Sequence, residues 1–263
     1  MIRSPIGLRL NSDPDRSIKD AIREAARLGA RAVVLDAAGD LAPDRLSETG
    51  RRDLSHTLRS CDIGLVALNL PTRRPFDSFD ELDVRLARVD RALALAYELG
   101  ARIVLIRAGQ TPPQEEKPRH EAFVHSLTEL GRRAERRGVR LAIETVGGPV
   151  GLLGEILTSI ASPGLAASVD PASLLRSGQD PAAAVVALGP HVAHAYAADA
   201  SGGPGPVVAH PRGQGYSAGV LDWEGYLGSL EEIDYRGYLT IWPDSSRDLA
   251  SGFAAIKGRL DRF

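Results

Sequence analysis

The stretch Arg137-Gly138-Val139-Arg140-Leu141-Ala142-Ile143-Glu144 contains the pattern that decides the fold. A glycine directly after a long amphipathic segment predicts the end of a helix, because glycine adopts the left-handed conformation of a helix C-terminus at low cost. The apolar run after it predicts a short buried strand. The same junction occurs at Leu99-Gly100-Ala101-Arg102. The chain is therefore expected to alternate helices with parallel strands.

Outward from this junction, a short apolar run followed by a longer segment of helical period repeats along the chain. Strands are expected at Ile6–Leu10, Ala32–Leu35, Leu65–Leu70, Arg102–Ile106, Arg140–Glu144, Leu165–Val169, Val192–Ala197 and Tyr238–Ile241. Helices are expected at Arg16–Leu28, Leu46–Cys61, Phe79–Leu99, Gln114–Arg137, Gly151–Ile160, Pro181–Leu188, Trp223–Ile233 and Ser246–Leu260. This alternation predicts an α/β fold of parallel β/α units.

Two arrangements suit such a chain: a closed barrel and an open doubly wound sheet. A dinucleotide-binding open sheet would carry a glycine-rich turn after its first strand. Here that turn is Asn11-Ser12-Asp13-Pro14-Asp15, without glycine. Single (β/α)₈ barrels commonly have about 250 residues. With no linker or break in composition, the 263 residues predict a single (β/α)₈ TIM barrel over residues 1–263, with a long irregular loop at Ala200–Val220.

Composition narrows the partners and the compartment. The fractions of hydrophobic and charged residues, 43% and 25%, are typical of a globular protein, and a net charge of −2 gives no reason to expect nucleic acid or an anionic membrane as partner. The single cysteine, Cys61, excludes an intramolecular disulfide and fits a reducing compartment. Neither a signal-peptide pattern after Met1 nor an apolar run of about 20 residues is present. We therefore expect a soluble, cytoplasmic protein.

The candidate site follows from the fold, because the C-terminal ends of barrel strands form the active sites of TIM barrels. Asp36 is expected to cap a helix, and the same role is open to Asp170, which precedes Pro171. Glu144 is the strongest candidate, since a glutamate is an unusual end for an apolar strand. The residues at the predicted strand ends are Asp36, Arg107, Glu144, Asp170, the segment His194–Asp199 and Trp242.

Several of these segments resemble a known family. Leu141-Ala142-Ile143-Glu144, Ser168-Val169-Asp170-Pro171-Ala172 and His194-Ala195-Tyr196-Ala197-Ala198-Asp199 are similar to the barrel of the xylose isomerase-like sugar-phosphate isomerases and epimerases. The resemblance continues through Arg212-Gly213-Gln214-Gly215, Leu221-Asp222-Trp223 and Tyr235-Arg236-Gly237-Tyr238-Leu239-Thr240-Ile241. It extends from about the third strand to the end of the chain.

The resemblance implies a metal site that this sequence only half retains. Family members hold one manganese, magnesium or zinc ion with a glutamate, an aspartate, a histidine and a second glutamate from strands five to eight. Glu144 and Asp170 match the first two ligands, and Glu144 is also the expected catalytic acid–base. At the position of the ligand histidine this sequence has Tyr196, and at that of the second glutamate it has Trp242. The expected cofactor is therefore none, or a weakly bound divalent ion, because affinity rises with the number of charged ligands.

Arg107 suggests how the site does without a full set of ligands. A guanidinium at the end of the fourth strand would pair with Glu144 or Asp170 and supply the positive charge of the ion, with Tyr196 and Trp242 filling the vacated space. The alternative is that Arg107 points outward and caps a helix. His194 faces the same side as Tyr196, one layer deeper, and suits packing or hydrogen bonding better than metal ligation.

These observations favour a sugar phosphate isomerase/epimerase-like barrel that acts on or binds a small sugar or hydroxy-carbonyl compound. The alternatives are a non-catalytic polyol-binding or protein-interaction barrel, and a lyase or dehydratase variant. Whether the protein turns over a substrate stays open, because the histidine and second glutamate of the site are missing. No exposed apolar stripe indicates an oligomeric state. The expected substrate-binding residues are Arg107, His194, Tyr196, Asp199, Arg212 and Trp242.

Overall fold

The computed structural model describes residues 4–11, 16–146, 148–198, 205–209, 215–218, 221–243 and 249–263. Eight parallel strands close into a barrel in the order β1-β10-β7-β6-β5-β4-β3-β2, which confirms the predicted (β/α)₈ architecture. The barrel strands are β1 (Ile6–Leu10), β2 (Ala32–Asp36), β3 (Gly64–Leu70), β4 (Ile103–Ile106), β5 (Arg140–Glu144), β6 (Leu165–Val169), β7 (Val192–Ala197) and β10 (Leu239–Ile241).

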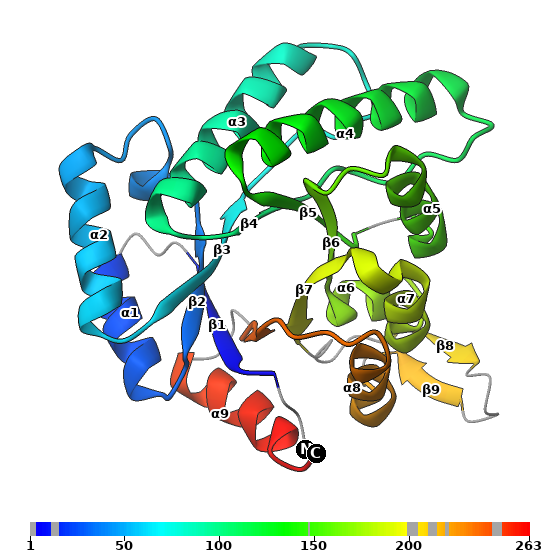
Figure 1. The fold of residues 1–263 in the computed structure, drawn as a ribbon. Helices are drawn as coiled ribbons and strands as arrows, with labels where there is room; N and C mark the ends of the chain where they lie inside the picture. The colour runs from blue at the N-terminus through cyan, green and yellow to red at the C-terminus, as the bar shows by residue number, and fades with distance from the viewer. Residues whose placement is uncertain are drawn as a thin grey trace.

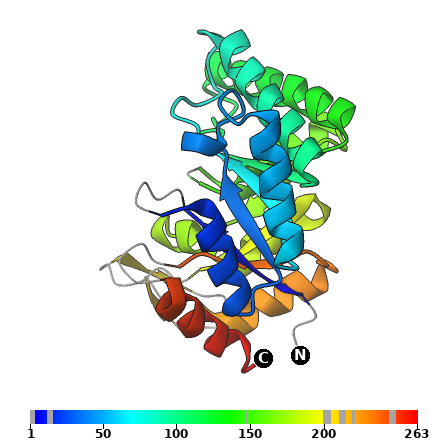
Figure 2. The ribbon, with the colours of Figure 1, turned by 90° about the vertical axis from the view of Figure 1, so that its left-hand side faces the viewer.

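Helices surround the barrel (Figures 1 and 2). The α-helices are α1 (Ile18–Arg27), α2 (Glu48–Ser60), α3 (Leu82–Leu99), α4 (Lys117–Arg137), α5 (Val150–Ile160), α6 (Pro171–Arg176), α7 (Pro181–Leu188), α8 (Trp223–Glu232) and α9 (Leu249–Leu260). Two short 3₁₀ segments are η1 (Gly39–Leu41) and η2 (Gly189–His191). No helix in the described ranges is both long and apolar enough to cross a membrane.

The junctions that predicted the fold have the expected geometry. Gly100 and Gly138 follow α3 and α4 with φ angles of 83° and 66°, and their backbone N–H groups close the last helical turns. A side chain would be strained at this positive φ, which explains glycine at both positions.

Two elements differ from the sequence prediction. The short helix α6 follows Asp170 directly and begins with proline, a pattern too short to show helical period. Part of the stretch predicted as irregular, Ala200–Val220, forms an antiparallel hairpin of β8 (Gly205–Ala209) and β9 (Gly215–Ala218) outside the barrel sheet. That prediction is wrong for these residues, because short β-branched and aromatic runs bounded by glycine suit hairpin strands.

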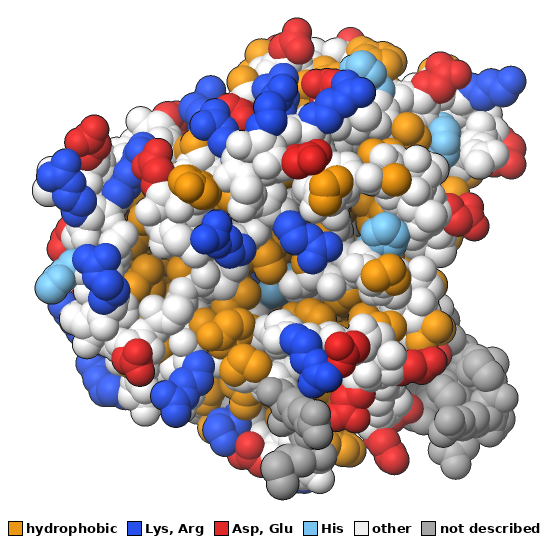
Figure 3. Space-filling view, viewed as in Figure 1, with side chains coloured by type: hydrophobic (Ala, Val, Ile, Leu, Met, Phe, Trp, Pro, Cys, Tyr) orange, Lys and Arg blue, Asp and Glu red, His pale blue; other side chains and the backbone are white. Residues whose placement is uncertain are grey.

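Apolar side chains fill both faces of the barrel strands, since helices cover the sheet from outside. All five residues of β6 are buried, for example. Outside, acidic and basic side chains are intermingled over the face seen in Figure 3. Against this apolar background a polar set stands out, because its members are buried: Arg9, Asn69, Glu144, Ser168, Asp170, His194 and Thr240.

Close backbone packing behind β6 generates a first prediction. A methyl group added at Gly164 would collide with the carbonyl oxygen of Gly131 and lie 2.7 Å from the backbone nitrogen of Glu135, both in α4. Backbone cannot move aside as a flexible side chain can, so Gly164→Ala is expected to lower the free energy of unfolding by about 1–3 kcal/mol.

Gly228→Ala is the matched control, because Gly228 is exposed on α8 and an added Cβ meets nothing within 4 Å. It is expected to stabilise the protein by about 0.5–1 kcal/mol through helix propensity. Urea-induced unfolding of both variants measures the difference, and equal stability of the two would contradict the tight contact between α4 and β6.

Candidate functional site

A buried arginine lies at the centre of the polar set. Arg9, in β1, is only 6% exposed. Its Nη1 donates to the Tyr196 hydroxyl at 2.6 Å and lies 3.5 Å from Glu144 Oε1, while Nη2 donates to Asp36 Oδ1 at 3.2 Å. Strands β1, β2, β5 and β7 thus each contribute a side chain to one charged cluster inside the barrel.

Glu144, the last residue of β5, is held between two guanidinium groups. Its side chain is 2% exposed, with Oε2 accepting from Arg107 Nε at 2.9 Å. Its Oε1 faces Arg9 and also accepts from the Tyr196 hydroxyl at 3.2 Å. Both carboxylate oxygens are therefore engaged, and the buried negative charge is compensated as such a charge requires.

The sequence allowed Arg107 to point inward, to a carboxylate, or outward, to a helix end. In the structure it points inward, to Glu144. It follows β4, its side chain is half exposed, and it reaches Glu144 through Nε rather than through a bidentate fork. Of the two carboxylates that Arg107 was expected to pair with, it contacts Glu144. Asp170 bonds to other residues.

Asp170 acts as a helix cap. Its Oδ1 accepts from the backbone nitrogen of Ser173 at 3.2 Å, and its Oδ2 accepts from the Ser173 hydroxyl at 2.5 Å. Its own backbone nitrogen donates to Thr145 Oγ1 at 3.0 Å. The carboxylate oxygens thus stabilise the N-terminus of α6.

Two aromatic rings enclose the Arg9 guanidinium. The half-buried Trp242, just after β10, has its ring centroid 3.8 Å from the Arg9 Cζ atom, in stacking range. The Tyr196 and Trp242 rings are 5.0 Å apart, and Tyr196 is fully buried. The two residues at the family's third and fourth ligand positions therefore both contact the guanidinium of Arg9.

The charges of this cluster fix its protonation. Burial alone would lower the pKa of Arg9, but Tyr196, Glu144 and Asp36 together raise it above the ordinary value. Burial, reinforced by the negative charge of Glu144, raises the pKa of Tyr196 well above its usual range. At neutral pH the cluster therefore contains a guanidinium cation and a neutral phenol that passes a hydrogen bond from Arg9 to Glu144.

His194 lies below this cluster and makes two hydrogen bonds. Its Nδ1 is 2.8 Å from Ser168 Oγ and its Nε2 is 2.9 Å from Thr240 Oγ1, and the ring is fully buried. Burial, together with the nearby positive charge of Arg9, lowers the pKa of His194 to about 3. The imidazole is therefore neutral at physiological pH.

The residues present do not fit the divalent ion that the resemblance implies. The oxygens of Glu144 face cations, those of Asp170 cap α6, and the other two ligand positions are Tyr196 and Trp242. Within the described ranges, no three His, Cys, Asp or Glu side chains are grouped as metal ligands would be. Asp199 and Arg212, the remaining expected binding residues, lie outside the described residues.

Sequence reasoning missed Arg9, and with it the role of Asp36. Asp36 does not cap a helix as expected; its Oδ1 accepts from Arg9 and, at 2.7 Å, from Asn69 Nδ2. One signal was available, since a charged residue inside a short strand covered on both faces must find compensation within the barrel. Asp36 comes from the neighbouring strand β2, whereas the approach of Glu144 depends on barrel closure, which brings β5 opposite β1.

A second prediction concerns the compensation of Glu144. Arg9→Met removes the cation but keeps a long side chain, so it leaves Glu144 and Asp36 in the interior with fewer partners. The free energy of unfolding is expected to fall by about 3–5 kcal/mol, as when one partner of a buried ion pair is removed.

The double variant Arg9→Met/Glu144→Gln is the diagnostic control. Because it also removes a buried negative charge, it should recover part of the stability lost in Arg9→Met, giving a non-additive cycle in urea unfolding. A double variant as unstable as the sum of the two single variants would contradict direct coupling between the two side chains.

A third prediction concerns acid stability. Since the pKa of His194 is about 3 in the folded protein and about 6.5 in an unfolded chain, the unfolded state binds one more proton between these values. This contribution to stability is complete above pH 6.5 and is lost as the pH falls toward 3, with a slope approaching about 1.4 kcal/mol per pH unit.

His194→Gln should remove that slope from the pH dependence of urea unfolding. His56→Gln is the control, because His56 is exposed on α2, and it should keep the slope of the parent protein. The slope, rather than the absolute stability, is the measured quantity; an unchanged slope in His194→Gln would contradict a buried neutral imidazole.

Comparison with known proteins adds the evolutionary context. A family model described as the xylose isomerase-like TIM barrel matches residues 22–258. A search of curated proteins by sequence finds no match. Among solved structures, the xylose isomerase domain protein from Planctomyces limnophilus is 19% identical, with a TM-score of 0.78 over 98% of this chain and 95% of that chain.

Two further solved structures share the fold. A D-tagatose 3-epimerase-like protein is 19% identical, with a TM-score of 0.77 over 98% of this chain and 97% of that chain. The D-allulose 3-epimerase from Methylomonas sp., in complex with D-allulose, is 16% identical, with a TM-score of 0.75 over 100% of this chain and 98% of that chain. At these identities the likeness shows the fold alone. Because the family model matches most of the sequence, the chain belongs to the xylose isomerase-like TIM barrel family.

Proposed function

We propose that this barrel is a sugar isomerase/epimerase-like protein that takes a small sugar or hydroxy-carbonyl compound at its C-terminal mouth, next to Glu144. The observation that carries the proposal is the carboxylate of Glu144 at the end of β5, held between Arg9 and Arg107. TIM barrels place their reactive groups at such strand ends. The structural neighbours named for sugar epimerases favour a sugar as the ligand.

The proposal includes an arginine cluster in the place of the divalent ion. Arg9 contacts three residues at ligand positions of the family, namely Glu144, Tyr196 and Trp242. An ion bound to Glu144 would have to displace Arg9 or Arg107 from a carboxylate that is nearly inaccessible to solvent. The exchange would leave a guanidinium without its anion, which is costly in the case of the buried Arg9.

Such a centre has a definite chemical capacity. A carboxylate can remove the proton on the carbon next to a carbonyl group, and a guanidinium donor can stabilise the enolate oxygen that results. With Trp242 at the position of the second glutamate, Glu144 would return the proton on the face from which it was taken. Delivery of that proton to the neighbouring carbon on the same face, with the hydroxyl proton passing to the former carbonyl oxygen, moves the carbonyl between the two carbons, whereas epimerisation needs a second proton donor opposite.

Non-catalytic binding of a polyol is the second candidate, and a specific observation favours it. Both oxygens of Glu144 already accept hydrogen bonds, and Glu144 and Tyr196 are 3% and 0% exposed. A base must reach the proton that it abstracts. If the cluster keeps this arrangement with ligand bound, Arg107 is the most accessible member of the cluster, and Trp242 and Asp36 are only partly exposed.

A fourth prediction tests the proposal with a panel of pentoses, hexoses and their phosphate esters. A true ligand at about 100 times its dissociation constant should add about 2.7 kcal/mol of stability, which is a rise of roughly 5 °C in melting temperature for a chain of this size. Glu144→Gln should reduce the rise, whereas Arg23→Gln, an exposed control on α1, should keep it.

Proton exchange in D₂O then separates the two candidates for the sugars that bind. Deuterium entering at a carbon next to the carbonyl, absent with Glu144→Gln, would establish catalysis, and binding without exchange would establish the polyol-binding role. Metal analysis of the protein as purified completes the test. A tightly bound stoichiometric divalent ion would overturn the arginine centre, and the absence of any sugar-induced stabilisation would overturn the sugar site.

A further inference from the structure

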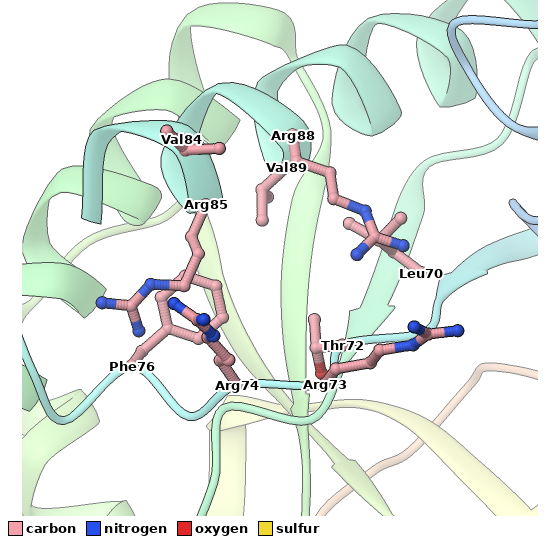
Figure 4. Close-up of a pocket in the computed structure, with 9 residues that line it drawn as sticks. All are labelled: Leu70, Thr72, Arg73, Arg74, Phe76, Val84, Arg85, Arg88 and Val89. Carbon is pink, nitrogen blue, oxygen red and sulfur yellow. The ribbon is translucent and has the colours of Figure 1, made fainter. Parts of the chain in front are cut away.

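Two cavities lie beside the mouth, where the loops that follow β3 and β4 meet. The larger has a volume of about 330 Å³ and includes Arg107 in its wall. The smaller, of about 220 Å³, lies under α3 and has a largely apolar floor. They share Thr72, Arg73 and Arg74 of the loop after β3, and Figure 4 shows these side chains facing Arg85 and Arg88 of α3 across the smaller cavity.

Arginine dominates the walls. Asp77 is the one acidic residue among the lining side chains of the two cavities, and it is buried and paired with Arg119. The arginines that line one cavity or both are Arg73, Arg74, Arg85, Arg88, Arg107 and Arg119. The lining side chains therefore carry a local excess of positive charge in a protein whose net charge is −2.

Two of these arginines have donors to spare toward the larger cavity. Arg107 uses Nε for Glu144, and within the described ranges neither Nη1 nor Nη2 has a hydrogen-bond partner. Arg73 is exposed and, among the described residues, makes neither a hydrogen bond nor an ion pair. Arg74 and Arg119 differ, since they pair with Glu81 and with Asp77 and Glu116.

The two loops are fixed against each other, so the backbone segments that carry Arg73 and Arg107 are held in place. The Thr72 hydroxyl donates to the carbonyl oxygen of Arg107 at 2.6 Å, and the Phe76 backbone nitrogen donates to the carbonyl oxygen of Ala108 at 2.7 Å. Gly109, at a φ of +103°, packs against Pro75 where a Cβ would clash. A loop backbone that is already ordered loses less entropy when its side chains bind a ligand.

We infer that the larger cavity binds an oxyanion group, a phosphate ester or a carboxylate, carried by the ligand of the mouth. The inference rests on the proposed function and names its substrate class as an anionic sugar derivative. Arg107 links the two regions, because its Nε fixes Glu144 while its free Nη groups form the fork that binds carboxylate and phosphate oxygens. Arg73, on the neighbouring loop, supplies a second cation.

The fifth prediction uses inorganic phosphate and acetate as probes of the full-length chain, titrated calorimetrically at constant ionic strength. We expect saturable binding of one anion per chain, weakened at least about tenfold by Arg73→Gln, which removes a charge-assisted hydrogen bond. Arg23→Gln, again the exposed control, should bind like the parent. The probe that binds more tightly tells whether the group is a phosphate or a carboxylate.

The sugar panel with its phosphate esters and uronates separates the two proposals. A charged sugar that binds at least about tenfold more tightly than its neutral parent, with the advantage lost in Arg73→Gln, supports both. Neutral and charged sugars that bind equally would overturn the anion site and leave the sugar site intact. If Arg73→Gln weakens binding of the probe anion but no sugar binds, the result would support the anion site and overturn the proposed function. Anion binding that Arg73→Gln leaves unchanged would overturn the inference.

Discussion

The guanidinium of Arg9, buried inside a closed barrel of apolar strands, is the constraint on which the rest of the site depends. An unpaired cation in such an interior would cost many kcal/mol, so every neighbour must contribute to its compensation. Glu144 and Asp36 provide negative charge, Tyr196 accepts a hydrogen bond, and Trp242 offers the face of its ring. The compensation is incomplete at one atom, since Nε has no partner within the described part of the chain.

One consequence passes outward from Arg9 to the surface. Because Arg9 and Tyr196 engage Oε1 of Glu144, the other oxygen remains for Arg107. That contact uses Nε and leaves the terminal nitrogens of Arg107 without a partner in the described part of the chain, in a side chain that also lines the cavity beside the loop after β3. A charged chain thus runs from Asp36 through Arg9 and Glu144 to a half-exposed cation. The same residues that neutralise a buried charge therefore orient a donor at the mouth.

The sequence predicted the barrel well, because local signals determine it. The glycine at the end of α3 or α4 and the apolar strand after it are short-range features, and the strand ends followed from them. Arg107 was predicted either to pair with Glu144 or Asp170 or to point outward, because it ends the strand beside that of Glu144. Arg9 could not be paired with Glu144 and Tyr196 in this way, because β5 and β7 do not neighbour β1 and approach it only through closure of the barrel.

Asp36 and Asp170 also show what the sequence could not predict about the site. Asp36 is the last residue of β2 and Asp170 directly follows β6, and for both the sequence predicted the same structural role, a helix cap. Asp170 is followed by proline and a short helix, and its oxygens bond to Ser173. Asp36 is followed by Ala37 rather than by a helix, and its oxygen turns inward to Arg9 and Asn69. The choice between a local backbone donor and the buried cation depends on whether Arg9 lies within reach of the carboxylate, which the sequence around each aspartate does not encode.

A guanidinium and a divalent ion differ in ways that bear on what such a centre can do. An ion accepts lone pairs from several directions and polarises a bound oxygen strongly, whereas a guanidinium donates hydrogen bonds in one plane and is fixed to the backbone. Arg9 is also stacked on Trp242, which occupies one face of that plane. Its in-plane donors are directed to Asp36 and Tyr196, with Glu144 near the limit of a hydrogen bond. Arg9 therefore acts as a structural counterion, and Arg107, with its free terminal nitrogens, is the cation of this centre that a ligand can meet.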